Sequence, residues 1–340
     1  MRCGIIGCGY WGSKHVRVLA GIPGVEVVAI DSSPQRRAAI ETTFGQVVTT
    51  ADRFSDVASS LDAVVIATPP ETHFALAAEA ILGGLHVLVE KPLTTSSSDA
   101  RKLIDMAGSA GVTLMTGHTF MYNPAVEKLR DIVQSGELGT VYHIDTARLN
   151  LGLYQQNVDV IWDLAPHDIS ILNYVLGEAP TTVRAWGGRY AHRTRHDVAY
   201  LQLDYRHVGA QVHVSWLEPR KVRRVTVVGS AKMAVYNDLA DDERLRIYDK
   251  GVVAQDTEQL HSVPTSYRNG GIMSPFVPFE EPLLREDRDF IHCISTGDAP
   301  VADGTSGLSV VRVLEAASEA LSTGGTVEFD LGSDVTGRIA

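Results

Sequence analysis

The chain has 340 residues, 44% hydrophobic and 21% charged, a composition that excludes a chain that is disordered, collagenous or coiled-coil throughout. At this length two domains are expected. The 30 basic and 41 acidic residues give a net charge of −11, which disfavours nucleic acid and anionic membranes as partners. No apolar run reaches the roughly 18 residues of a membrane helix. The chain opens on a segment that reads as a strand and not as a signal peptide, so we expect a cytoplasmic protein. Its three cysteines fit neither a disulfide framework nor a zinc site.

The first part of the chain alternates short apolar segments with segments of helical pattern. Apolar runs without polar alternation indicate strands that are covered on both faces, as in a parallel sheet. We predict strands at residues 2–6, 25–30, 46–49, 63–67, 86–90 and 113–116, and helices at 11–20, 34–44, 72–83 and 97–110. This order predicts an α/β Rossmann domain, a doubly wound parallel sheet, over residues 1–118.

The pattern changes after residue 118. A helix is predicted at 124–135, and strands follow at 141–149, 182–190, 199–205, 210–216, 223–228 and 233–237. Several of these strands alternate polar and apolar residues, which indicates an antiparallel sheet with one exposed face. Helices at 168–176, 282–296 and 305–322 complete an α+β domain over residues 119–340, with a large open, mainly antiparallel sheet. The stretch 264–282 is rich in Pro, Gly and Ser and is expected to be a mobile loop.

A glycine motif directly follows the first predicted strand. Gly7, Gly9 and Gly12 fit Gly-x-Gly-x-x-Gly between a strand and a helix, where glycines permit a tight turn and close approach of a pyrophosphate to the helix N-terminus. Asp31 ends the next strand, where a carboxylate accepts hydrogen bonds from the adenosine ribose and repels the 2′-phosphate of NADP. We therefore predict NAD as the cofactor. Arg36 and Arg37 can offset this repulsion, although a solvated helix face explains them more simply.

Polar residues also follow two other predicted strands. One strand leads into Thr68, Pro69 and His73, and another ends in Glu90-Lys91-Pro92. Because ligands of open α/β sheets bind outside the carboxyl ends of the strands, Lys91 is a candidate site residue.

Asp163 and His167 form a further candidate pair. They lie four residues apart, so they share one helix face or one turn and can converge on one substrate group. A histidine suits reversible proton transfer near neutral pH. The alternative is that His167 caps the following helix and Asp163 is a polar turn residue.

These motifs, in this order, resemble the glucose-fructose oxidoreductase/inositol dehydrogenase/rhizopine catabolism (Gfo/Idh/MocA) family. The resemblance covers nearly the whole chain and is carried by the glycine motif, Ala67-Thr68-Pro69-Pro70-x-x-His73, Glu90-Lys91-Pro92, Gly117-His118-Thr119-Phe120, Asn123-Pro124 and Asp163-x-x-x-His167. It implies a Rossmann domain and a second domain whose open sheet often forms an oligomer interface. It also implies oxidation or reduction of secondary alcohols of sugars and cyclitols with a nicotinamide cofactor.

The resemblance implies roles for three residues. The family's lysine maps onto Lys91, which would stabilise the developing alkoxide. Its catalytic pair maps onto Asp163 and His167: His167 would transfer the hydroxyl proton, and Asp163 would orient the substrate or the imidazole. Ala165 stands where relatives often have glycine, and some relatives have tyrosine at the position of His167.

The remaining candidate residues fall into two groups. Cofactor contacts are predicted from Gly7, Gly9, Tyr10, Trp11, Gly12, Asp31, Ser32, Thr68, Pro69, His73, Glu90, Lys91 and His118. Substrate contacts are predicted from Lys91, Phe120, Asn123, Arg148, Tyr154, Trp162, Asp163 and His167, and a structural role is an equal alternative for those outside the catalytic three. No metal site is predicted, because the other histidines show no ligand spacing.

The expected function is that of an NAD-dependent dehydrogenase. It would oxidise a secondary alcohol, most plausibly at C3, of a sugar, an amino sugar such as an aminoglycoside, or a nucleotide sugar. The alternatives are an NAD(P)H-dependent 3-keto-sugar ketoreductase of deoxysugar biosynthesis, an inositol-type cyclitol dehydrogenase, and a non-catalytic dinucleotide sensor. The net charge of −11 slightly favours a neutral or aminated sugar over a sugar phosphate.

We also expect a homo-oligomer, a dimer or tetramer, that forms through the C-terminal sheet. Trp186, Tyr205 and Trp216 would pack between the subunits unless they belong to the core.

Overall fold

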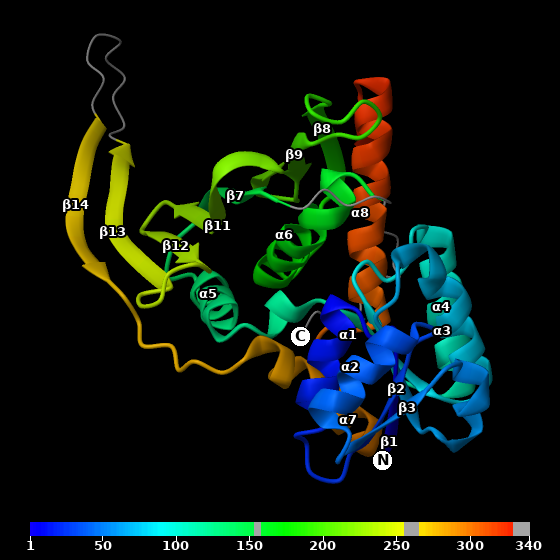
Figure 1. Cartoon of the computed structure of the whole chain (residues 1–340). Coiled ribbons are helices and arrows are strands. Elements are labelled where there is room, and N and C mark those ends of the chain that lie inside the picture. The colour runs from blue at the N-terminus through cyan, green and yellow to red at the C-terminus, as the bar shows by residue number, and fades with distance from the viewer. Residues whose placement is uncertain (153–157, 255–264, 329–340) are drawn as a thin grey trace. The chain divides into compact units, whose positions relative to one another are not determined.

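The computed structural model describes residues 1–152, 158–254 and 265–328 (Figure 1). The chain forms two compact units: Met1–Asn123 with Glu280–Glu315, and Pro124–Phe279 with Ala316–Ala340. The predicted domain boundary at residue 118 did not include the return of residues 280–315 to the first unit. That boundary stays a prediction. Tyr154, a predicted substrate contact, lies outside the described residues.

The first unit is built on a parallel sheet of six strands in the order β3-β2-β1-β4-β5-β6. The strands are β1 (Arg2–Ile6), β2 (Glu26–Ile30), β3 (Val48–Ala51), β4 (Ala63–Ile66), β5 (His86–Glu90) and β6 (Leu114–Gly117). β4 is buried along its whole length, as its unbroken apolar run predicts. The strand order reverses between β1 and β4, and the carboxyl ends of the strands at such a switch point are where nucleotides bind. The predicted doubly wound fold is confirmed.

Helices cover both faces of this sheet (Figure 1). The α-helices are α1 (Tyr10–Leu19), α2 (Pro34–Phe44), α3 (His73–Leu82), α4 (Ser97–Ala110) and α7 (Pro282–Thr296), and α8 (Gly304–Thr323) begins in this unit. Short 3₁₀ helices occur at η1 (Phe54–Asp56), η2 (Ala58–Ser60), η3 (Pro70–Thr72) and η4 (Thr119–Tyr122). The returning α7 packs against α1, so residues from the far end of the sequence enter the core beside the glycine motif.

The second unit is built on a nine-stranded sheet in the order β14-β13-β12-β11-β7-β10-β9-β8-β15. The strands are β7 (Val141–Leu151), β8 (Thr182–Gly188), β9 (Val198–Asp204), β10 (Gly209–Ser215), β11 (Leu217–Gly229), β12 (Met233–Asn237), β13 (Leu245–Ala254), β14 (Thr265–Met273) and β15 (Thr326–Glu328). Strands β7 and β10 pair in parallel and the other described pairs are antiparallel. Helices α5 (Pro124–Gln134) and α6 (Val160–Leu176) pack on one face of the sheet. The predicted open, mainly antiparallel sheet is confirmed.

Two expectations about the second unit need correction. The helix predicted at 168–176 begins earlier, at Val160, because Asp159 accepts hydrogen bonds from the backbone N–H groups of Ile161 and Trp162. The stretch predicted as a loop from residue 264 contains strand β14, which pairs with β13. Pro264 itself lies outside the described residues.

The aromatic residues considered for subunit packing fall on two different faces. Trp216 and Tyr205 are buried in the core, with 1% and 5% of their surface exposed, whereas Trp186 is 58% exposed. Trp186 is the exposed end of a row of rings with the half-buried Tyr200 and His213: Tyr200 lies 5.6 Å from Trp186, at a tilt, and is stacked on His213 at 4.0 Å, centroid to centroid. Trp186 therefore remains a surface residue available for a partner, and the other two are core residues.

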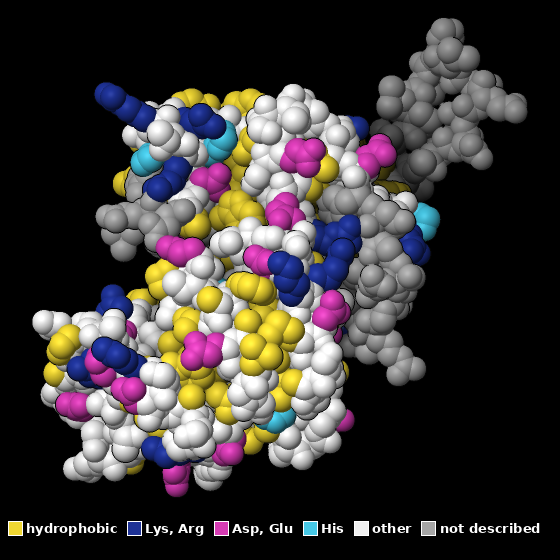
Figure 2. All heavy atoms as spheres, turned by 90° about the vertical axis from the view of Figure 1, so that its right-hand side faces the viewer, with side chains coloured by type: hydrophobic (Ala, Val, Ile, Leu, Met, Phe, Trp, Pro, Cys, Tyr) yellow, Lys and Arg dark blue, Asp and Glu magenta, His cyan; other side chains and the backbone are white. Residues whose placement is uncertain are grey.

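The surface of the described chain mixes charges of both signs. Basic and acidic side chains are interspersed on the face drawn in Figure 2. Within the described residues, no helix combines the length and the apolar character needed to cross a bilayer.

Candidate functional site

The glycine turn between β1 and α1 has a backbone that only small residues permit. Gly7 has φ +92°, and a Cβ atom there would lie 2.8 Å from the carbonyl oxygen of Ala67. A Cβ atom on Gly12 would lie 1.7 Å from the carbonyl oxygen of Gly7, so the turn and the helix pack directly on each other. At Gly9, by contrast, a Cβ atom would meet nothing within 4 Å. Two glycines thus serve internal packing, and the third leaves the backbone open to a ligand.

The amino end of α1 suits an anion. Gly9 is the N-cap residue, it provides no side-chain cap, and the first turn of the helix contains no acidic residue. The backbone N–H groups of a helix start carry partial positive charge and bind phosphate readily. The turn therefore fits the pyrophosphate of a dinucleotide.

Asp31 connects the end of β2 to this turn. Its carboxylate accepts hydrogen bonds from the backbone N–H groups of Cys8 and Ser33, both at 2.8 Å, and Arg36 Nη1 lies 3.4 Å from Asp31 Oδ2. Burial opposes the charge on Asp31, but these contacts outweigh burial and hold the pKa of the carboxyl below its usual value. Arg37 contacts the backbone carbonyl of Asp31 and, at 2.8 Å, the carboxylate of Asp52. Asp31 is thus an ionised group that also shapes the glycine turn.

The ends of β4 and β5 are joined by a buried histidine. His73 Nδ1 lies 2.8 Å from the carbonyl oxygen of Pro92, and Nε2 lies 2.9 Å from that of Thr68. Burial lowers the pKa of His73, so one ring nitrogen at a time carries the donated proton. The side chain of His73 lies between the two turns that follow β4 and β5, and its predicted contact with the cofactor stays a prediction. Pro69, after β4, and Ser32, after β2, are exposed.

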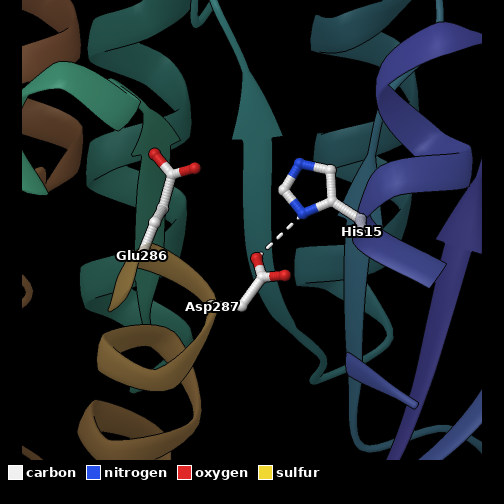
Figure 3. Close-up of side chains that lie close together, drawn as sticks. All are labelled: His15, Glu286 and Asp287. Atoms are coloured by element: carbon white, nitrogen blue, oxygen red, sulfur yellow. Dashed lines mark hydrogen bonds and ion pairs between the residues drawn. The ribbon is translucent and has the colours of Figure 1, made fainter. Parts of the chain in front are cut away.

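Glu90 at the end of β5 belongs to a buried polar cluster. Its Oε2 accepts the backbone N–H of Lys91 at 3.1 Å, and its Oε1 lies 3.3 Å from His15 Nε2. His15 Nδ1 lies 2.8 Å from Asp287 Oδ1 on α7 (Figure 3). The sequence analysis missed His15 and Asp287, because a contact across 272 sequence positions leaves no local pattern.

The same cluster contains the one group of potential metal ligands found among the described residues. His15, Glu286 and Asp287 offer ligand atoms within 4.8 Å of one another, and all three are buried. Both ring nitrogens of His15 already face carboxylates, so the histidine is part of an ion-pair network.

His118 follows β6, the strand next to β5. It is 1% exposed, and neither ring nitrogen has a hydrogen-bond partner among the described residues. Burial lowers the pKa of His118 to about 4; the charge of Glu90 opposes this shift, and a smaller effect of Lys91 adds to it. The ring is therefore neutral near physiological pH and can offer one donor and one acceptor to a ligand.

This histidine predicts a pH dependence of stability. With a folded pKa of about 4 and an unfolded value near 6.5, the unfolded chain binds more protons in between. The stability linked to His118 is therefore complete above about pH 6.5 and is lost as the pH falls toward 4, by about 3 kcal/mol in total. In urea unfolding from about pH 7 to about pH 4.5, wild-type protein should lose about 2–3 kcal/mol more than His118→Asn. Equal losses would contradict the assignment.

Helix α6 of the second unit carries the predicted catalytic pair. Asp163 and His167 stand four residues apart in its first two turns, so they share one helix face, as predicted. Asp163 Oδ2 accepts a hydrogen bond from the indole Nε1 of the buried Trp216 at 3.2 Å. That contact fixes one carboxylate oxygen of Asp163 to the sheet.

Two of the predicted substrate contacts have structural partners. Arg148 on β7 is buried, and its Nε lies 2.6 Å from Oδ2 of the buried Asp168. The indole of Trp162 donates to the hydroxyl of Ser318 at 3.0 Å. Of the others, Asn123 is buried and Phe120 is half-buried at the end of β6.

Two family models match the chain. The model described as "Oxidoreductase family, NAD-binding Rossmann fold" matches residues 1–118, and the "GFO/IDH/MocA C-terminal domain" matches residues 126–235. The chain is 29% identical to UDP-N-acetylglucosamine 3-dehydrogenase of Acidithiobacillus ferrooxidans over 93% of this chain and 95% of that protein. It is 24% identical to inositol 2-dehydrogenase of Rhizobium meliloti over 93% and 96%.

Solved structures agree with these matches. The structure of the A. ferrooxidans dehydrogenase has a TM-score of 0.81 at 26% identity and covers 95% of this chain and 98% of its own. An oxidoreductase of Magnetospirillum magnetotacticum has a TM-score of 0.78 at 29% identity, with coverages of 93% and 98%. With both family models in sequence order and the glycine turn built as a dinucleotide site, the chain belongs to the Gfo/Idh/MocA family of oxidoreductases, with an NAD-binding Rossmann domain followed by the family's C-terminal domain.

Proposed function

We propose that the protein is an NAD-dependent dehydrogenase that oxidises a secondary alcohol, at C3, of a sugar, an amino sugar or a nucleotide sugar. The observation that carries this proposal is the placement of Asp163 and His167 on one face of α6, with Asp163 fixed by Trp216. A relative that aligns over nearly the whole chain is a UDP-N-acetylglucosamine 3-dehydrogenase, which supports a sugar substrate and position C3.

The reaction needs a hydride acceptor and a proton acceptor. When bound, the nicotinamide supplies the hydride-accepting carbon. His167 takes the proton from the substrate hydroxyl, because a neutral imidazole is the suitable base near neutral pH. Lys91 donates a hydrogen bond to the same oxygen and stabilises the negative charge that develops as the proton leaves. Asp163 orients the substrate or the His167 ring.

The substrate is best sought by direct turnover. Purified protein with NAD⁺ should form NADH with UDP-N-acetylglucosamine or with an unphosphorylated aminoglycoside, and hydrazine added as a ketone trap drives the unfavourable oxidation forward. Glucose and myo-inositol complete the panel, and turnover of myo-inositol would favour the cyclitol alternative. In a parallel reaction without hydrazine, reduction of the ketone product with borodeuteride, followed by NMR, locates the oxidised carbon. Protein that binds NADH but oxidises none of these substrates, and reduces no 3-keto sugar, would favour the sensor alternative.

Asp31 predicts a preference for NAD over NADP. Its ionised carboxylate would repel a 2′-phosphate, so the Kd for NADH should be at least about tenfold lower than that for NADPH. Asp31→Asn removes the charge while keeping an acceptor oxygen for one of the two N–H groups, those of Cys8 and Ser33, and should reduce the preference about tenfold. Asp52→Asn is the matched control, because Asp52 contacts Arg37 and not the glycine turn. A preference for NADPH in the wild type would overturn the cofactor assignment.

We also propose that the protein forms a homo-oligomer through the exposed face of β8, β9 and β10. Trp186, the exposed end of the row of rings with Tyr200 and His213, offers apolar surface on that face, and this supports a contact with another protein chain. Sedimentation equilibrium should give a mass of a dimer or tetramer, and Trp186→Asp should lower it. A monomeric wild type would contradict this proposal.

A further inference from the structure

A buried row of side chains joins three elements of the first unit that are distant in sequence. Asp287 on α7 lies 2.8 Å from Nδ1 of His15 on α1 (Figure 3). Nε2 of that ring lies 3.3 Å from Glu90 at the end of β5. The other carboxylate oxygen of Glu90 accepts the backbone N–H of Lys91 at 3.1 Å. His15 and Asp287 are fully buried, and Glu90 is 6% exposed. The row therefore ends on the backbone of the proposed catalytic lysine.

The two contacts of His15 specify its charge. Each ring nitrogen faces a carboxylate oxygen, and only the doubly protonated ring can donate from both nitrogens. Although burial alone would lower the pKa of His15, the two carboxylates outweigh burial and raise it well above the usual value. A neutral ring would turn a lone pair toward one of the two carboxylates, so with both acids ionised the row holds together only while His15 is charged.

Other ionisable groups surround this row. Glu286 lies on the same helix as Asp287, with a ligand atom within 4.8 Å of those of His15 and Asp287, and it accepts a hydrogen bond from Thr119. Burial and the charge of Glu90 raise the pKa of Glu286 well above its usual value. Glu281 interacts electrostatically with Asp287, and His118 interacts electrostatically with Glu90 and Lys91. Of these groups, Asp287 and Glu90 are the ones that hydrogen-bond His15.

We propose that His15 and Asp287 are positioning residues for hydride transfer: the His15 ring, held by Asp287, fixes the Glu90 carboxylate and thereby the backbone of Lys91 against the helix that starts at the glycine turn. The proposal rests on the proposed role of Lys91. The ring sits in the second turn of α1, whose first turn fits the pyrophosphate, so one side chain connects the phosphate-binding helix to the lysine turn. Neither residue touches a reacting atom in this scheme, and both act through Glu90.

The test replaces Asp287 by asparagine, which keeps the shape and an acceptor for Nδ1–H but removes the charge. The pKa of His15 should then fall into the neutral range, so the ring loses its proton and its contact with Glu90 as the pH rises. The backbone N–H of Lys91, measured by NMR hydrogen exchange in protein without cofactor, should exchange about tenfold faster above neutral pH than in the wild type. The kcat with UDP-N-acetylglucosamine should acquire a fall at alkaline pH that the wild type lacks.

Glu286→Gln is the matched control. It makes the same isosteric change at the neighbouring, equally buried position, on an acid that does not hydrogen-bond His15 and whose pKa burial raises. Lys91 amide exchange and the pH profile should stay those of the wild type. A second measurement, ¹⁵N NMR of the histidine rings, reports the charge on His15 directly and does not depend on activity.

Each result decides the proposal. Doubly protonated His15 in the wild type, its titration in Asp287→Asn and matching pH dependence of Lys91 amide exchange would support it. A neutral His15 in the wild type, or Lys91 exchange that does not follow the titration, would overturn it. If no sugar is oxidised, the proposed function fails, whereas the amide exchange and ring NMR still decide whether the row holds the lysine turn. A variant whose kcat falls equally at every pH would show a merely structural role for Asp287 and would also overturn the proposal.

Discussion

Replacing Lys91 by methionine is expected to lower kcat about 10³-fold while the Kd for NADH changes less than about threefold. Methionine keeps the length and the apolar stem of the side chain but has no donor for the oxygen that becomes negative during oxidation. The backbone N–H of Lys91, which Glu90 accepts at 3.1 Å, is untouched by the change. The loss should therefore fall on the chemical step and leave cofactor binding in place. Stopped-flow formation of NADH with a substrate from the panel above, and fluorescence titration with NADH, measure the two quantities.

Lys102→Met is the matched control for Lys91→Met. Lys102 lies on α4 of the same unit, its side chain is 59% exposed, and its ammonium pairs with Asp99 one turn away. Such exposed pairs contribute little, so neither kcat nor NADH binding should change by more than about twofold. A Lys91→Met variant that keeps kcat within about threefold of the wild type would remove Lys91 from the mechanism.

The elements that were predicted with their observed bounds have strong local signals. The helix at 34–44 starts at Ser33, which accepts the N–H of Arg36, and has Pro34 in its first position. The helices at 97–110 and 282–296 end at Gly111 and Gly297, which adopt the left-handed conformation that glycine favours. Hydrophobic pattern and caps agree at these positions, so the sequence alone was sufficient.

Other elements were misread because one signal concealed another. The helix predicted at 168–176 begins earlier, because Asp159 provides its cap and Pro166 lies inside α6, where it removes a single donor. Strands β13 and β14 carry charged and glycine positions, such as Lys250 and Gly270, that weaken the strand pattern. Burial of Trp216 was readable from the sequence, since it continues the two-residue period of Val212 and Val214, which are also buried.

The candidate site divides in the same way between local and distant signals. The glycine turn, Asp31 and the spacing of Asp163 and His167 are local patterns. The glycine turn and Asp31 lie at the predicted strand ends, whereas Asp163 and His167 lie inside α6, which begins before the helix predicted at 168–176. The buried partners could not be predicted, because Asp287 reaches His15 only through the return of α7 to the first unit. Arg148 is a case in which the sequence suggested a contact but not the partner. It was predicted to contact substrate, and its burial against Asp168 was visible only in the fold.

Replacing Arg148 by methionine is therefore expected to act on stability. Arg148 and Asp168 are 5% and 1% exposed, and removal of the guanidinium leaves a buried carboxylate without this ionic partner. Breaking one side of a buried ion pair costs about 3–5 kcal/mol, so Arg148→Met should lower the free energy of unfolding by about that amount. The double variant Arg148→Met/Asp168→Leu removes both charges and should recover at least about half of the loss. Urea unfolding followed by tryptophan fluorescence suits this test, because Trp162, Trp186 and Trp216 all lie in the unit that contains the pair.

The alternative role for Arg148 makes a different prediction, which the same variants separate. If the guanidinium binds substrate, Arg148→Met raises KM and leaves the free energy of unfolding within about 0.5 kcal/mol of the wild type. Arg184→Met is the matched control, since Arg184 lies on β8 of the same sheet, is exposed and contacts the hydroxyl of Thr326. It should change stability by no more than about 0.5 kcal/mol. A destabilised Arg148→Met that the second substitution rescues places this arginine in the framework that holds α6 against β7, and so one step behind the Asp163–His167 pair.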